Sequence, residues 1–555
     1  MKLFQQLLVA PAALGLMAPM AANAADLDIK GVSDYSASSE QVTSISQFQD
    51  VYPTDWAYQA LSNLIERYGC VAGYPSGSYL GNRAMTRFEA AALLNACLDR
   101  ITEVTDELRR LLNEFEQELA ILKGRVDGLE ARVGELEATQ FSTTTKLVGQ
   151  TSFVLGAVNA GGDESLSDPY NEEVGAFTFT YDLRLGLNTS FTGKDLLYTR
   201  LRSGNMDSTA WEGEGLKGSL TALDTASATD DIVTIDRLYY RFPVGDEFTF
   251  IAGPLARNTE MLGIKPTAYG KSKVLDYFGG TMGTPGVYNK ETGGAFGAIW
   301  KQKTSKGDPA FSASVSYVSD AGEANDGNPS TGGFITDNAE GNITGQLAYS
   351  SKRWGVALGY RYGQCGVKFR RGTDFVADNK WHQNCQQVVG FDADGDEVFD
   401  QRSGAYSNNF AVNAFWKPED SGWIPSVSAG WGLSGLSGDF YDLADNDLED
   451  DLEDQVADQF QSWMVGLQWS DVFIEGNYLG LAGGQPQFVT SLKGDETTYD
   501  GNYAFELWYK FQVTDNISIT PAVFYLSRPM GQNTGDQYDN QFNVFGGVVQ
   551  TTFKF

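Results

Sequence analysis

The sequence is poor in histidine, in cysteine and in long apolar runs. Among its 555 residues there is one histidine, His382, and there are four cysteines. A single histidine argues against a histidine-based metal site and against a Ser-His-Asp triad. Beyond the N-terminus, no apolar run reaches the roughly 20 residues of a membrane-spanning helix. We therefore do not expect an enzyme, although carboxylate chemistry stays open as an alternative.

Positive charge is scarce as well, since 40 Lys and Arg stand against 72 Asp and Glu, a net charge of −32. Nucleic acid requires a basic surface, so we expect no nucleic-acid partner. Glycine, with 62 residues, and aromatic residues, at 13%, are frequent instead. Tight turns and aromatic girdles of a membrane β-barrel use these residues, and its half-polar strands keep hydropathy low.

Residues 1–24 have the three parts of a secretory signal peptide. Lys2 supplies the charge, Leu7 to Met20 the apolar segment, and Ala22-Asn23-Ala24 the cleavage site. A retained membrane anchor is the alternative, but the segment is short and broken by proline. Export would place the cysteines in an oxidising compartment. Pairing of sequence neighbours predicts one of three possible disulfide sets: Cys70–Cys97 and Cys365–Cys385.

Residues 25–47 read as a flexible linker rich in Ser and Gln, and residues 48–100 as two short helices. An apolar residue every fourth position from Trp56 to Tyr68 gives the first helix one apolar stripe. Thr86-Arg87-Phe88-Glu89 fits a capping box that begins the second. The FQDV, WA, GYPSG and TRFE motifs of this segment together resemble one S-layer homology (SLH) module.

That resemblance implies that residues 48–100 bind cell-wall polysaccharide linked to peptidoglycan. The candidate contacts are Asp50, Trp56, Gly73 and Arg87. Trp stacks on sugar faces, and Arg forks onto a carboxylate or phosphate. A core position for Trp56 and a helix cap at Asp50 are the structural alternatives. The resembled proteins often carry three modules where this chain has one, so a full ligand site could require several chains.

Residues 101–138 predict a coiled coil. Apolar positions from Ile101 to Leu136 alternate by three and four residues, with one stutter after Phe115. Charged residues fill most other positions, and three glycines would weaken a lone helix. A single helix folded back on the SLH module is the alternative.

Residues 145–555 alternate about sixteen predicted strands with turns, which indicates a mainly β fold, a closed antiparallel transmembrane barrel. Every second connection is short, such as Thr192–Asp195 and Ser351–Arg353, and those between are long, such as Gln364–Ser407. Short turns at one rim and long loops at the other are typical of outer-membrane barrels. Two soluble β-sandwiches, the alternative, would not produce this alternation.

The final stretch, Asn543–Phe555, is predicted to close the barrel by pairing with Lys146–Val158. An unpaired apolar edge strand invites aggregation, and closure removes that edge. One of its faces is apolar and directed to lipid, the other polar and directed to the lumen: Phe545, Val549 and Phe553 against Gln550 and Thr552.

This barrel resembles the carbohydrate-selective OprB-type porins. Together with the SLH module and the coiled coil, it resembles the cyanobacterial outer-membrane porins, including those named iron-uptake porins. The resemblance implies a homotrimer in the lipid of the outer membrane, with the SLH module in the periplasm and Phe555 as an assembly signal. It implies passive diffusion of small hydrophilic solutes and inorganic ions. A structural tether between membrane and wall, or carbohydrate- or iron-selective uptake, is the alternative.

Strand parity directs a set of arginines to the lumen, because lipid exposure of Arg costs about 2–4 kcal/mol: Arg184, Arg200, Arg202, Arg237 and Arg241. The last two share their face with Val233, Ile235 and Tyr239. The long connection Ala256–Thr292 carries five cationic residues and is expected to fold inward. Such a ring of positive charge favours anions. In the alternative, the arginines pair with acids such as Asp182 and Asp236 and only brace the wall.

The outer loops are acidic, and one of them has clustered carboxylates that suit Ca²⁺: Asp392, Asp394 and Asp396. The loop lacks the late Glu and the flanking helices of an EF-hand. A solvated acidic loop is therefore the alternative, and we expect no other cofactor.

Overall fold

The computed structural model describes residues 144–212, 219–271, 274–305, 307–329, 331–377, 388–391, 397–399, 404–420, 422–438, 457–493, 498–535 and 541–555. The predicted signal peptide, linker, SLH module and coiled coil lie outside these residues. So do the candidate polysaccharide contacts, the candidate calcium loop, and Cys70, Cys97 and Cys385. Cys365 is disulfide-bonded, and its predicted partner Cys385 is one of the residues left undescribed.

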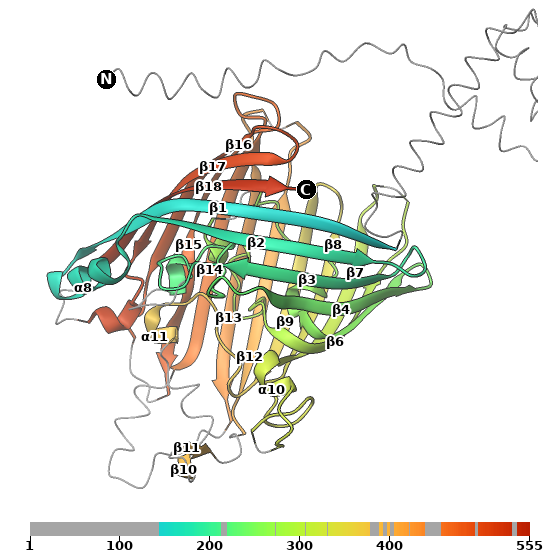
Figure 1. Cartoon of the computed structure of the whole chain (residues 1–555), viewed down its shortest axis with the longest axis horizontal. Helices are drawn as coiled ribbons and strands as arrows, with labels where there is room; N and C mark the ends of the chain where they lie inside the picture. The colour runs from blue at the N-terminus through green and yellow to red at the C-terminus, as the bar shows by residue number, and fades with distance from the viewer. Residues whose placement is uncertain are drawn as a thin grey trace, which may run out of the picture. The chain divides into compact units, whose positions relative to one another are not determined.

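Sixteen antiparallel strands close into one barrel, which confirms the predicted fold class (Figure 1). The strands are β1 Thr145–Gly162, β2 Thr178–Thr189, β3 Leu196–Gly204, β4 Thr234–Val244, β5 Phe248–Arg257, β6 Thr292–Lys301, β7 Ala310–Asp320, β8 Asn342–Ser350, β9 Trp354–Gln364, β12 Tyr406–Trp416, β13 Ser426–Ser437, β14 Ala457–Ser470, β15 Tyr478–Leu492, β16 Tyr503–Gln512, β17 Ile517–Ser527 and β18 Phe542–Lys554. Each barrel strand pairs with the strands before and after it in the barrel order. Every connection therefore joins two adjacent strands, and successive connections alternate between the two rims.

The connections contain short elements of their own. These are α8 Glu164–Val174, η2 Ser219–Thr221, η3 Asn258–Glu260, α9 Asp276–Gly279, α10 Ala321–Ala324, α11 Asp374–Ala377, the hairpin of β10 Val388–Phe391 with β11 Glu397–Phe399, and η5 Gly531–Thr534. In Figure 1, α8 lies at the end of the barrel away from the C-terminus, which is the end that carries the long loops.

The predicted closing pair is confirmed. β18 pairs with β1 in antiparallel register, from Gln150 opposite Lys554 to Gly162 opposite Phe542. Beyond the strand, the Phe555 amide donates to the Gly149 carbonyl at 3.0 Å, and the Gly149 amide donates back at 2.6 Å. Phe545 and Val549 are exposed on the outside, whereas Gln550 and Thr552 are buried inside. The two-residue period of the last strand therefore sorts lipid from lumen as predicted.

The alternation of apolar residues in the sequence predicts strands over Val174–Phe191, Trp423–Leu433 and Val472–Leu481, and in the structure each of these strands begins later. The prediction Val174–Phe191 was wrong at its start, because residues 164–174 form α8 and β2 begins at Thr178. Asp163 caps this helix by accepting from the Ser165 amide at 2.9 Å. The predictions Trp423–Leu433 and Val472–Leu481 included turn residues, since β13 begins at Ser426 and β15 at Tyr478. Apolar turn side chains at a membrane interface imitate the start of a strand.

A β-bulge in β4 explains why strand parity was ambiguous there. Arg200 lies opposite Arg237 and Leu201 opposite Ile235, so Asp236 is the extra residue. One extra residue reverses the side to which the following side chains point. Ile235 is therefore 51% exposed on the outside while Arg237 is only 1% exposed inside. A strict alternation would have placed both on one face.

The connection between β5 and β6, residues 258–291, folds into the lumen as the sequence predicts. Its backbone amides donate to side chains of distant strands: Gly263 to Ser314 of β7, Ile264 to Gln346 of β8, Tyr269 to Ser428 of β13 and Lys271 to Gln468 of β14. Across the lumen on β16, the Glu506 carboxylate accepts from the Tyr269 hydroxyl at 2.6 Å and from the Leu275 amide at 2.9 Å. The connection is thus attached to the wall on several sides.

Two further connections contact the β5–β6 connection inside the barrel. In the β3–β4 connection, the Asp224 amide donates to the Val274 carbonyl at 2.9 Å, and Leu223 forms a β-bridge with Leu275. In the β9–β12 connection, Arg370 and Arg371 reach Asp276. Because three connections meet around residues 274–276, the lumen is narrowed by a packed assembly and not by one loose loop.

The seam between β1 and β18 leaves no room for a side chain at Gly156, whose added Cβ would lie 2.3 Å from the Gly547 carbonyl oxygen. We expect Gly156→Ala to lower the free energy of unfolding by about 1–3 kcal/mol, as overpacking does. The measurement is a urea titration that follows the fraction of folded barrel, which migrates differently from the heated, unfolded chain on a gel. Gly345→Ala on β8 is the control, since its Cβ has no neighbour closer than 3.9 Å. Equal stability of the two variants would contradict the packing of this seam.

Glu506 holds the inward connection to the opposite wall, so Glu506→Ala should loosen it. Two buried donors would lose their acceptor, at a cost of about 1–3 kcal/mol for each donor left unsatisfied. We expect larger and noisier single-channel currents than in the unmodified protein. Glu475→Ala, at an exposed turn, is the matched control. Currents indistinguishable from the control would show that Glu506 does not hold the connection.

Candidate functional site

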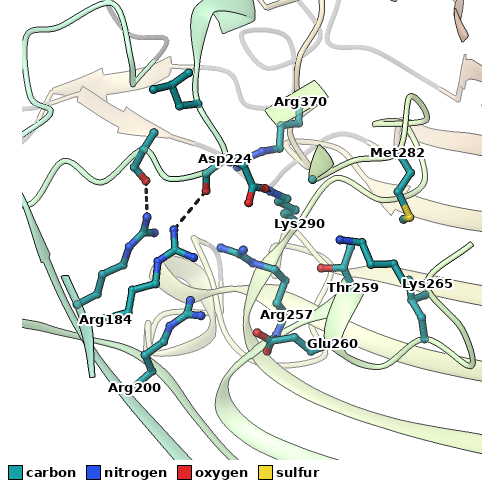
Figure 2. Close-up of a pocket in the computed structure, with 15 residues that line it drawn as sticks. Arg184, Arg200, Asp224, Arg257, Thr259, Glu260, Lys265, Met282, Lys290 and Arg370 are labelled. Carbon is teal, nitrogen blue, oxygen red and sulfur yellow. Dashed lines mark hydrogen bonds and ion pairs between the residues drawn. The ribbon is translucent and has the colours of Figure 1, made fainter. Parts of the chain in front are cut away.

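A cationic cavity of about 200 Å³ lies where the inward connection faces β2 and β3. Figure 2 shows side chains that reach it from the barrel wall and from three connections. We call the following lining residues the cationic cavity: Arg184, Arg200, Arg202, Leu223, Asp224, Ala226, Arg257, Thr259, Glu260, Leu262, Lys265, Gly280, Met282, Lys290 and Arg370. Seven of them are cationic and two are acidic, so the lining is strongly positive.

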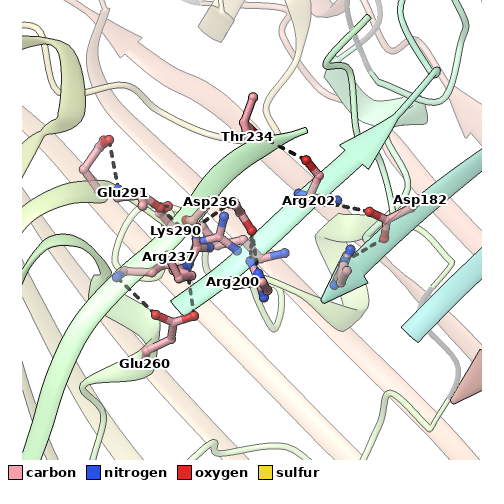
Figure 3. A network of polar contacts seen from close by, with 12 residues as sticks. Asp182, Arg200, Arg202, Thr234, Asp236, Arg237, Glu260, Lys290 and Glu291 are labelled. Carbon is pink, nitrogen blue, oxygen red and sulfur yellow. Dashed lines mark hydrogen bonds and ion pairs between the residues drawn. The ribbon is translucent and has the colours of Figure 1, made fainter. Parts of the chain in front are cut away.

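The arginines of β2 and β3 are fixed by carboxylates of the same strand or of a neighbouring one (Figure 3). Asp182 is fully buried and pairs with Arg184 at 2.6 Å and with Arg202 at 2.8 Å. Asp236, the bulge residue, accepts from the Arg200 Nε at 2.5 Å. These ion pairs hold the guanidinium groups in the low-dielectric wall, where an unpaired charge would be costly. The bracing alternative from the sequence is therefore present together with the positive lining.

Backbone carbonyls of the β3–β4 connection hold the same arginines from the lumen side. Arg184 donates to the Asp224 carbonyl at 3.3 Å, and Arg202 donates to the Thr225 carbonyl at 3.4 Å and to the Ala226 carbonyl at 2.5 Å. Guanidinium has five donors, so carboxylate and carbonyl partners together do not exhaust them. Part of the donor capacity of these guanidinium groups therefore stays unused by these contacts.

Arg257, at the end of β5, differs from the other arginines. Its Nε donates to the Thr292 hydroxyl at 3.1 Å. Of the carboxylates that the structure describes, none forms an ion pair with its guanidinium. Figure 2 shows this side chain reaching into the cavity close to Glu260 and Lys290. Glu260 and Asp236 lie near enough to act on its charge, but neither forms a direct ion pair with it.

Asp276, the first residue of α9, joins the connections around the cavity. It is fully buried, and it pairs with Lys290, with Arg371 at 2.6 Å and with Arg370 at 3.0 Å. Burial alone would raise the pKa of the Asp276 carboxyl, but Lys290 and the two arginines outweigh burial and hold this pKa below its usual range. The carboxylate therefore stays charged and ties three cations in place.

The charges of the cavity lining and of the ion pairs around it do not cancel. Among the described residues, the set has nine cations and five carboxylates, a surplus of four positive charges. The cations are Arg184, Arg200, Arg202, Arg237, Arg257, Lys265, Lys290, Arg370 and Arg371, and the carboxylates are Asp182, Asp224, Asp236, Glu260 and Asp276. The chain as a whole has a net charge of −32, so this positive region is local. Such a region lowers the energy of an anion.

The structure gathers some of the predicted lumen arginines and not others. Arg184, Arg200 and Arg202 line the cationic cavity. Arg237 lies behind the lining, where it pairs with Asp236 and Glu260, both at 2.9 Å. Arg241 is exposed and is not part of the lining.

Arg370 and Asp224 are lining residues that the sequence did not identify. They come from long connections without periodicity, so parity cannot place them. The one available signal was the dense cationic run Lys368-Phe369-Arg370-Arg371.

The described part of the chain gives two further results. No helix in it is long and apolar enough to cross a membrane. It also has no group of three or more His, Cys, Asp or Glu residues that could hold a metal ion.

The family comparisons divide the chain in two. Residues 103–555 match the family model described as carbohydrate-selective porin, OprB family, and residues 47–91 match the S-layer homology domain. An uncharacterized protein of Nostoc sp. is 36% identical, over 93% of this chain and 86% of that protein. An uncharacterized protein of Synechocystis sp. is 30% identical, over 95% of this chain and 93% of that protein.

Among solved structures, OprB of Pseudomonas putida is 12% identical and covers 76% of this chain and 96% of its own, with a TM-score of 0.46. The family model and the two relatives extend over most of the chain, barrel and inward connection included. The chain therefore belongs to the OprB family of carbohydrate-selective porins, as an outer-membrane channel that also carries an S-layer homology domain.

Proposed function

We propose that the chain is a passive diffusion porin for small hydrophilic solutes that prefers anions, and that its SLH module anchors it to peptidoglycan-linked polysaccharide. The observation that carries the preference is the cationic cavity, where the inward connection faces the arginines of β2 and β3. A solute that passes this point is close to several guanidinium groups at once. The proposal assigns the chain no catalytic activity.

The energy of an anion near these guanidinium groups depends on its distance from them and on screening by salt. In a pore with an effective dielectric constant near 20, one unit charge at 4 Å changes the energy of an ion by about 4 kcal/mol before screening. Salt reduces this, because the Debye length is about 8 Å at physiological ionic strength. A surplus of several charges survives such screening at short range, so the preference for anions should be measurable in ordinary salt.

Support for anchoring comes from the SLH match at residues 47–91. The candidate contacts there stay Asp50, Trp56, Gly73 and Arg87. With a single module per chain, a homotrimer held by residues 101–138 would present three modules to the wall. The tether and the pore are thus two functions of one molecule, located in separate segments.

Loss of a lining arginine should shift ion selectivity. We expect Arg202→Gln to lower the ratio of anion to cation permeability about three- to tenfold, because it removes one charge and leaves Asp182 less neutralised, a change of about 1 kcal/mol or more after screening. The zero-current potential of reconstituted protein under a KCl gradient measures this ratio. Arg353→Gln is the control, since Arg353 lies in a short turn, paired with exposed Glu419. A cation-selective channel, unchanged in Arg202→Gln, would refute the anion preference.

Removal of the SLH module should separate anchoring from conduction. A chain without residues 48–100 should no longer sediment with purified peptidoglycan sacculi, while its single-channel conductance in bilayers stays that of the full chain. Trp56→Ala in the full chain should reduce sedimentation without changing conductance. If the shortened chain still sediments with sacculi, the anchor lies elsewhere.

A further inference from the structure

We propose that the cationic cavity is a saturable binding site for a doubly charged tetrahedral oxyanion, namely inorganic phosphate or the phosphate group of a monoester. This inference rests on the proposed anion-preferring channel and names the solute class that the constriction holds. A general positive field would only speed the passage of anions. A site with directed donors would also retain one class of them.

The donors converge from separate elements. Arg184 and Arg200 belong to the wall strands β2 and β3, Arg257 to the end of β5, and Lys265 and Arg370 to two different connections. A tetrahedral oxyanion has acceptor oxygens in several directions, so donors from several sides suit it. The planar fork of Arg matches two phosphate oxygens at once, which a spherical chloride ion cannot use.

The charge of the cavity suits a doubly charged ligand. Ion pairs with Asp182, Asp236 and Asp276 fix the cations but leave the surplus of four positive charges described above. A dianion compensates twice as much of this surplus as a monovalent ion. Arg257 is the natural first contact, because no described carboxylate pairs with its guanidinium, and the Thr259 hydroxyl lies in the same lining.

The lining lacks the groups that hold a neutral sugar. Proteins bind sugar faces mainly by stacking them on aromatic rings. Of the fifteen residues that line the cavity, none is aromatic, and its apolar members are Leu223, Ala226, Leu262 and Met282. In a phosphorylated sugar, the phosphate would therefore be the part that the cavity recognises.

The cavity is also pre-organised for a ligand. Asp276 fixes Lys290 and Arg370, and Asp182 fixes Arg184 and Arg202, so these side chains lose little freedom when an anion enters. Pre-ordered donors increase affinity because the cost of ordering them was met on folding. This rigidity distinguishes a binding site from a diffuse charged region.

The test is a competition measured on the full-length channel in planar bilayers. Chloride current is recorded while inorganic phosphate, glucose 6-phosphate, methyl phosphate or unmodified glucose is added at constant ionic strength. We expect phosphate and the two monoesters to reduce chloride current in a saturable manner, and glucose to leave it unchanged. A stronger block by glucose 6-phosphate than by phosphate would assign the site to monoesters, and the reverse to free phosphate.

Two variants locate the site. Arg257→Gln should raise the half-blocking phosphate concentration about tenfold or more, because a lost hydrogen bond between charged groups is worth at least that factor. Lys265→Gln, on the inward connection, should act in the same direction, so that the test survives if one variant fails to fold. In the control variant Arg353→Gln, phosphate should block the chloride current at the same concentration as in the unmodified protein.

The outcomes separate this inference from the proposed function. An anion-selective channel whose chloride current phosphate does not reduce overturns the oxyanion site and leaves the anion preference intact. A saturable block by glucose alone overturns the site as well and indicates a sugar site. A cation-selective channel overturns both.

Discussion

The interior of this barrel depends on the ion pairs of one buried carboxylate, that of Asp276. Three connections that are far apart in sequence approach one another inside the lumen. Two of them bring cations, Lys290 from the β5–β6 connection and Arg370 and Arg371 from the β9–β12 connection. Without a shared counter-charge, Lys290, Arg370 and Arg371 would repel one another in a region of low dielectric constant. Asp276 pairs with all three. Its backbone amide also donates to the Ala222 carbonyl of the β3–β4 connection at 3.0 Å. Because this one residue contacts all three connections, the cationic cavity can be both rigid and positive.

The wall of the barrel provides the complementary half of the site. The arginines of β2 and β3 point inward because exposure of Arg to lipid is costly. Ion pairs with Asp182 and the bulge residue Asp236 fix their side chains. The inward connection is then attached to strands on the far side, from Ser314 to Glu506. The result is a constriction whose two sides belong to different parts of the chain. Its surplus of positive charge is the basis of the proposed preference for anions, and its lining without aromatic rings distinguishes it from a surface that stacks neutral sugars.

How much of this the sequence predicts depends on periodicity. The closing strand, the lumen side of Arg184, Arg200 and Arg202, and the inward course of residues 258–291 follow from alternation, burial cost and connection length. Parity failed at Asp236, because a bulge is a local event that no two-residue pattern reveals. α8 was missed because its apolar spacing of four residues follows directly on a strand. Arg370 and Asp224 were missed because long connections carry no register, and only the folded barrel brings them to the cavity.

We propose that a positive constriction controls what passes through the barrel. The most direct measurement is the zero-current potential of the unmodified full-length protein in a planar bilayer, under KCl gradients of increasing ionic strength. The account predicts an anion preference that is strongest in dilute salt and declines as screening increases. A preference for cations in dilute salt would contradict it.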